Sequence, residues 1–156
     1  MSKKKFILQG ALFGAVVSFL IASIFTMVVR MVVGGYLFGT VLNSGERWLY
    51  FAVIIPFSMA FAWLGGYFFD KKQVRTKTLW KISFMTTLFI LLYCGTIGVI
   101  FWESIIQGKF ETINVSDTLG WGMFYAFVLT PFFTPITLLL INVFTELILK
   151  LESYTD

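Results

Sequence analysis

Long apolar runs separated by short clusters of charged residues constrain this chain more than any other feature. A helix needs about 20 apolar residues to cross the hydrocarbon core of a bilayer. Charged residues make up 13% of the chain, against about a quarter of a soluble domain. The sequence therefore predicts an all-α integral membrane protein, a single domain over residues 1–156. Its four expected spans cover residues 6–29, 48–69, 82–102 and 121–148.

A second apolar stretch, Met31–Leu42, follows the first run directly after Arg30. One helix from residue 6 to residue 42 would be about 55 Å long, which exceeds the thickness of a bilayer. Gly34 and Gly35 offer a break within it. We therefore expect a short interfacial or re-entrant segment over residues 31–42. The alternative is that the first helix extends beyond the membrane.

The distribution of basic residues predicts the orientation. The N-terminus carries three of them, the basic loop at residues 70–81 five and the C-terminal tail one, which is nine of the twelve Lys and Arg residues. Basic loops stay on the cytoplasmic side, so both termini are expected there. The lysine-led start and compact loops favour a multi-pass protein of the bacterial inner membrane. The run at 6–29 is longer than the roughly 7–15 apolar residues of a signal peptide, so it is expected to remain as a span.

The residue types argue against catalysis. The chain has no histidine, the commonest general base and zinc ligand. Its one cysteine, Cys94, lies within an expected span and is interpreted as a small apolar side chain. We therefore expect no enzyme activity, no cofactor and no metal. The basic residues that give the formal charge of +4 flank apolar runs, so a nucleic-acid partner is not expected either.

Two groups of charged residues are candidates for contacts at the membrane surface. Arg30 and Glu103 are both expected near the outer face, where they could form an ion pair; alternatively Arg30 extends to the interface alone. The cations of the basic loop are expected to contact anionic lipid head groups or an acidic partner. They are Lys71, Lys72, Arg75, Lys77 and Lys81.

The last apolar run contains two Thr-Pro pairs and a polar stripe. At 100° per residue one half of this helix is polar and the other, which includes Phe144, is apolar. In the packing interpretation, threonine hydroxyls bind carbonyls that the prolines leave without a donor, while the remaining polar groups meet neighbouring helices. Alternatively the stripe lines a water path, but its one ionisable group lies near the cytoplasmic end, which favours packing. The stripe comprises Thr130, Pro131, Thr134, Pro135, Thr137, Asn142, Thr145 and Glu146.

Gly10 and Gly14 form a small-xxx-small pair, which lets another helix approach closely. Together with the polar stripe, this pair predicts a non-catalytic membrane protein that acts through helix–helix association. Its partner would be another copy or a different membrane protein, as for accessory, immunity or defence-type subunits. The alternative function is an oligomeric conduit for ions or small solutes, lined by the fourth helix.

Overall fold

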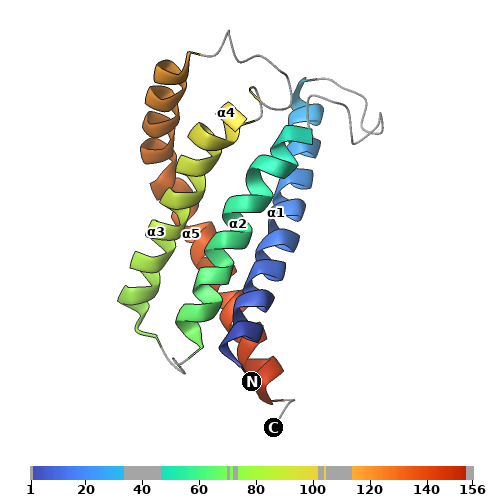
Figure 1. Ribbon diagram of the computed structural model, residues 1–156, viewed down its shortest axis with the longest axis vertical. Coiled ribbons are helices and arrows are strands. Elements are labelled where there is room, and N and C mark those ends of the chain that lie inside the picture. The colour runs from blue at the N-terminus through green and yellow to red at the C-terminus, as the bar shows by residue number, and fades with distance from the viewer. Residues whose placement is uncertain are drawn as a thin grey trace.

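The computed structural model describes residues 2–33, 47–69, 71, 74–101, 104 and 114–153, without the side chains at 25, 28–33, 47–51 and 148–153. Over these residues the chain forms a bundle of helices with no strand (Figure 1). The elements are α1 (Lys3–Val33), α2 (Arg47–Phe68), α3 (Thr76–Tyr93), the π-helix η1 (Cys94–Gly98), the short α4 (Val99–Phe101) and α5 (Val115–Ser153).

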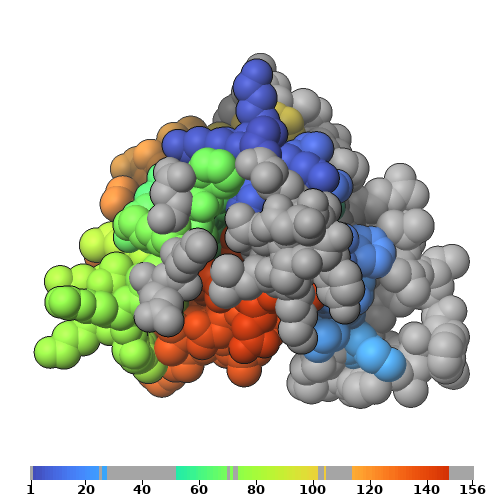
Figure 2. All heavy atoms as spheres, turned by 90° about the horizontal axis from the view of Figure 1, so that it is seen from below, coloured from blue at the N-terminus to red at the C-terminus, as the bar shows by residue number. Residues whose placement is uncertain are grey.

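The ends of the helices fall at two levels of the bundle. The start of α1, the α2–α3 connection and the end of α5 lie together at the lower end in Figure 1. Figure 2 views this end and shows the atoms of α5 between those of α3 and those of α1. Among the contacts between different helices, α1 packs mainly against α2, and α3 packs mainly against α5.

The length and composition of the helices fit an all-α membrane protein. Among the described residues, Lys3–Ile24, Thr76–Phe101 and Val115–Leu147 are long and apolar enough to cross a membrane, and Ala52–Phe68 of α2 is a shorter apolar helix. Large apolar side chains face outward, with Phe132 72% and Leu139 62% exposed. Many buried positions hold Ser or Thr instead. This inside-out distribution is the pattern of helices that pack within lipid.

Two helices extend beyond the boundaries expected from the apolar runs. α1 continues through Arg30 to Val33, which accords with the alternative of a longer first helix; residues 34–42 lie outside the described part, so the interfacial or re-entrant segment stays a prediction. Similarly, α3 begins at Thr76, so residues 76–81 of the expected basic loop are helical. The cause is the same in both places. Apolar runs mark the depth of the hydrocarbon, whereas a hydrogen-bonded helix can continue into the polar interface.

The start of α5 is fixed by a cap that the apolar pattern does not show. The Asn114 Oδ1 atom accepts a hydrogen bond from the Asp117 N–H at 3.3 Å. The Asn114 carbonyl also accepts the Thr118 N–H at 3.0 Å. An asparagine in this role satisfies donors that the first turn of a helix leaves unbonded. The helix therefore begins at Val115, before the expected span at 121–148.

α1 and α2 are in direct backbone contact at three glycines. A Cβ atom built on Gly10 would lie 2.1 Å from the carbonyl oxygen of Phe61, and one on Gly14 would lie 2.4 Å from that of Phe57. From the other helix, a Cβ on Gly65 would lie 2.4 Å from the carbonyl oxygen of Phe6. The contacts follow one antiparallel register, with four residues forward on α1 matching four residues back on α2. The predicted role of Gly10 and Gly14 in close helix approach agrees with this geometry.

Three aromatic rings join this pair of helices to α5. The ring centroids of Phe13 and Phe61 are 5.1 Å apart, and Phe144 lies 5.1 Å from Phe13 and 5.4 Å from Phe61. These separations are typical of favourable aromatic pairs. Phe61 and Phe144 are buried, so the triangle forms part of the apolar core shared by α1, α2 and α5.

Substitution of Gly14 tests this contact. We expect Gly14→Ala to lower the free energy of unfolding by about 1–3 kcal/mol, because the new methyl group forces the two backbones apart. The matched control is Gly120→Ala, since a Cβ on Gly120 meets nothing within 4 Å. That substitution should leave stability unchanged or raise it by up to about 1 kcal/mol. Unfolding in mixed micelles, followed by circular dichroism, measures both; equal stability of the two variants would contradict the interpretation.

Candidate functional site

Buried hydroxyl groups line the contact between α3 and α5, and we call this set the hydroxyl seam. Its members on α3 are Ser83 and Thr87, which are 0% and 2% exposed. On α5, Thr130, Thr134 and Thr137 are 1%, 4% and 8% exposed. The three threonines recur at spacings of four and three residues, which places them on one face of the helix.

Every hydroxyl of the seam binds a carbonyl of its own helix. Thr130 Oγ1 donates to the Ala126 carbonyl at 2.6 Å and Thr134 Oγ1 to the Thr130 carbonyl at 2.7 Å. One contact joins the helices, between the hydroxyls of Thr87 and Thr137 at 2.7 Å. The seam is therefore a packed interface with satisfied hydroxyls, and two surface hollows of the described residues are lined by other side chains.

The expected pairing of threonines with proline-released carbonyls is wrong in detail. Pro131 and Pro135 lack the N–H groups that would bind the carbonyls of Phe127 and Pro131. The threonine hydroxyls bind the carbonyls of Ala126 and Thr130 instead, each one residue earlier. A threonine reaches the carbonyl four residues before itself, and each threonine here precedes its proline by one position. Such bonds favour bending, and α5 changes direction near its middle (Figure 1).

The predicted polar stripe of α5 divides between two faces. Thr130, Thr134 and Thr137 are buried, whereas Asn142 and Glu146 are exposed and Thr145 is half-buried. Both Pro131 and Pro135 are exposed. The buried arc is centred on Thr130 and includes Ile141 and Phe144. Polarity alone had placed Phe144 on the outer half; size and packing decide the inner face.

The split bears on the proposed conduit. Asn142 lies about 120° around α5 from Thr130 at 100° per residue. A path lined by Thr134, Asn142 and Glu146 together would need these side chains on one surface. In the described structure Thr134 is buried while the other two are exposed.

The π-helix η1 brings α3 against two neighbours, and sequence reasoning missed its most specific contact. Pro56 leaves the carbonyl of Ala52 without its helical N–H donor. The thiol of Cys94 donates a hydrogen bond to this carbonyl oxygen, with the sulfur at 3.6 Å. Cys94 thus has a polar role beyond that of a small apolar side chain. Because a buried carbonyl needs a donor, a neighbouring helix is the expected partner for the carbonyl that Pro56 releases.

A second glycine contact closes the same region. A Cβ atom on Gly122 of α5 would lie 2.2 Å from the carbonyl oxygen of Gly95 in η1. A Cβ on Gly98 would lie 3.2 Å from the Cβ of Ala52 on α2. Small residues of one π-helical turn thus let α3 approach α5 on one side and α2 on the other.

The described cations of the basic loop lie at the bundle end that holds the start of α1. Lys71, Arg75, Lys77 and Lys81 are exposed there. Lys72 and Glu103 lie outside the described residues, as does the side chain of Arg30, so the Arg30–Glu103 ion pair stays a prediction.

The described residues thus form an all-helical protein with three long apolar helices and a shorter one, held together by glycine contacts and buried hydroxyls. Within them, no three His, Cys, Asp or Glu side chains are grouped as metal ligands would be. No known protein family, curated protein or solved structure matches the chain. The function is therefore argued from the geometry alone.

A double-mutant cycle tests the one bond that crosses the hydroxyl seam. We expect Thr87→Val and Thr137→Val to show a coupling of about 0.6 kcal/mol in unfolding free energy, the usual size for hydrogen bonds between membrane helices. The matched control pairs Thr87→Val with Thr134→Val, because the Thr134 hydroxyl binds only its own helix. Equal coupling in the two cycles would show that the inter-helix bond contributes nothing.

Proposed function

We propose that this protein is a small, non-catalytic, multi-pass membrane protein that acts by associating through α5 with a second copy or with a partner membrane protein. The observation that carries the proposal is the outward position of Asn142. Its side chain is exposed on an apolar helix, and no partner for its amide is present among the described residues.

The depth of Asn142 in the bundle supports this assignment. Phe144, two residues further on, contacts Phe61 of α2. α2 continues for seven residues beyond Phe61 to its end at Phe68, or about 10 Å at 1.5 Å per residue, and the cation Lys71 lies beyond that end. If Lys71 lies at the interface, Asn142 faces the hydrocarbon core. An amide there is costly unless a donor and an acceptor from another helix meet it.

The flanking surface suits a helix partner. Phe132, Ile136 and Leu139 are all more than half exposed, and Val143 is 41% exposed. They continue along α5 at spacings of three or four residues, as does Asn142, which gives one outward seam. A single polar residue in such an apolar seam commonly fixes the register and partner of associating helices.

Replacement of the amide should weaken association. We expect Asn142→Leu to reduce energy transfer between labelled copies in vesicles, or recovery of the native partner, by about three- to thirtyfold, which corresponds to about 0.6–2 kcal/mol. Asn142→Gln keeps the amide and should retain most of the association. Protein that stays monomeric in mild detergent and brings down no partner from native membranes would contradict the proposal.

The orientation forms a second part of the proposal. Four spans with both termini in the cytoplasm, in a bacterial inner membrane, place the exposed cations Lys71, Arg75, Lys77 and Lys81 on the cytoplasmic side, as the positive-inside rule requires. The common level of the chain ends and the α2–α3 connection supports this arrangement (Figure 1).

Reporter fusions test this orientation. Alkaline phosphatase, which is active only outside the cytoplasm, should be active when fused at Asn114 and inactive when fused after Ser153. A matched fusion at Lys71 should also be inactive. Activity at Lys71 or its absence at Asn114 would reverse the assignment.

A further inference from the structure

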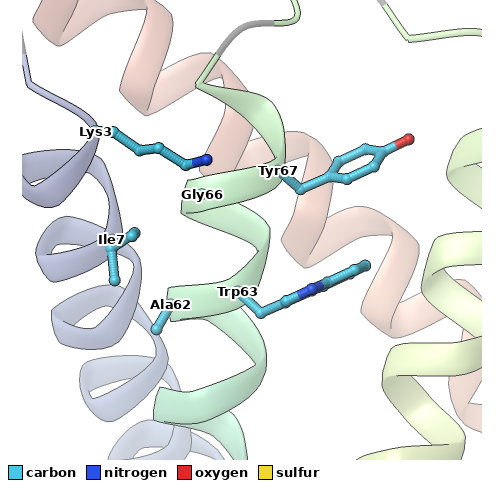
Figure 3. Close-up of a pocket in the computed structure, with 6 residues that line it drawn as sticks. All are labelled: Lys3, Ile7, Ala62, Trp63, Gly66 and Tyr67. Carbon is cyan, nitrogen blue, oxygen red and sulfur yellow. The ribbon is translucent and has the colours of Figure 1, made fainter.

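A hollow of about 520 Å³ lies between α1 and α2 at the bundle end that carries the basic residues. Figure 3 shows Lys3 extending from α1 across α2 at Gly66, with Ile7 and Ala62 further along the same groove. Trp63 and Tyr67 project from the adjacent face of α2. These six residues, with no carboxylate among them, line the hollow.

Gly66 keeps this hollow open, whereas its neighbour Gly65 serves helix contact. A Cβ on Gly66 would lie 3.4 Å from Cγ1 of Ile7 and 3.9 Å from Cε of Lys3, which are ordinary contact distances. Close approach of the helices therefore does not require glycine at this position. Its missing side chain instead leaves room beneath the Lys3 chain.

A column of aromatic and cationic side chains forms one wall. The rings of Trp63 and Tyr67 stack with centroids 5.5 Å apart and an interplanar angle of 23°. The Nζ atom of Lys71 lies 3.6 Å from the centre of the Tyr67 ring. Trp63 and Tyr67 are four residues apart on α2 and share one face, and Lys71 follows beyond the end of the helix. Trp, Tyr and Lys in this order are typical of a helix that emerges from the hydrocarbon into the head-group layer.

A second, apolar hollow lies on the other side of Trp63, between α2 and α3. Its volume is about 320 Å³, and Trp63 lines both hollows. From Met59, at its far side, to the end of α2 at Phe68 the helix rises about 14 Å, which is close to the depth of half a hydrocarbon core, about 15 Å. The lining of this second hollow comes from α2 and α3 and consists of Met59, Ala60, Trp63, Met85, Thr86 and Phe89.

We propose that these two hollows form a binding site for one anionic phospholipid. The ammonium groups of Lys3 and Lys71 bind the head-group phosphate, and an acyl chain passes Trp63 into the hollow lined by Met85 and Phe89. Charge complementarity selects an anionic head group, because Lys3 lines the hollow, Lys71 lies over the ring of Tyr67 in its wall, and none of the six lining residues is a carboxylate. The depth of the apolar part selects a lipid over a soluble anion. This site is separate from the association through α5.

Quenching of Trp63 fluorescence tests the site. A variant with the other four of its five tryptophans changed to Phe is reconstituted in phosphatidylcholine vesicles. A small fraction of either brominated phosphatidylglycerol or brominated phosphatidylcholine is then added. We expect stronger quenching by the phosphatidylglycerol at equal mole fraction. Lys3→Gln should lower this preference about fivefold, the effect of about 1 kcal/mol per lysine near the surface.

Three controls decide between this site and its alternatives. Lys77→Gln removes an exposed cation outside the hollow and should leave the preference unchanged; an equal loss in Lys77→Gln and Lys3→Gln would mean a diffuse basic surface and overturn the site. Gly66→Leu should fill the hollow and remove the preference while the helical circular dichroism is kept. Equal quenching by both lipids overturns the proposal, as does a preference that survives Gly66→Leu. Loss of the preference on addition of inorganic phosphate would assign the cations to a free anion.

Discussion

The backbone contact between α1 and α2 sets the positions of the other features. Gly10, Gly14 and Gly65 each face a carbonyl oxygen at a distance that no side chain permits, so the register of the two helices is fixed to the residue. The direction of each other side chain on α2 then follows from the rotation of 100° per residue in an α-helix. Phe61 faces inward to meet Phe144, and Gly66, one position beyond the contact glycine, opens toward the surface hollow. A shift of one residue would move every group on α2 to another face.

The contacts of η1 with α5 and α2 also depend on glycine, and they include one hydrogen bond between helices. Gly95 and Gly122 bring η1 and α5 together, while the thiol of Cys94 binds the Ala52 carbonyl that Pro56 leaves without a donor. The π-turn and the proline each disturb the regular hydrogen bonding of their own helix. The bond between Cys94 and Ala52 joins these two irregular sites. Hydrophobic burial offers little driving force between helices in lipid, so close packing and internally satisfied hydroxyls hold such a bundle together.

The sequence allowed the helical class and the glycine contact to be predicted, because apolar runs and four-residue spacing are local signals. The four-residue spacing of Gly10 and Gly14 continues through Ser18 and Ala22, which are both buried. The same spacing of small residues could therefore have predicted the full contact face of α1. The helix ends were not predictable from apolarity, which reports depth in the membrane and not hydrogen bonding. Partners across helices, such as Cys94 with Ala52 or Thr87 with Thr137, depend on register and rotation that no local pattern contains.

The way the bundle satisfies its polar groups indicates where function can reside. The hydroxyls of Thr130 and Thr134 are already bonded within α5, so the hydroxyl seam has little left to offer a ligand. Asn142 and the two lysines near the hollow face outward, and they differ in chemistry. The Asn142 amide is uncharged and both donates and accepts hydrogen bonds, so another helix suits it best. The ammonium groups of Lys3 and Lys71 carry charge and only donate, so a phosphate suits them. On this reasoning the outer surface has a region for protein and a separate region for lipid, and the interior serves to hold them in place.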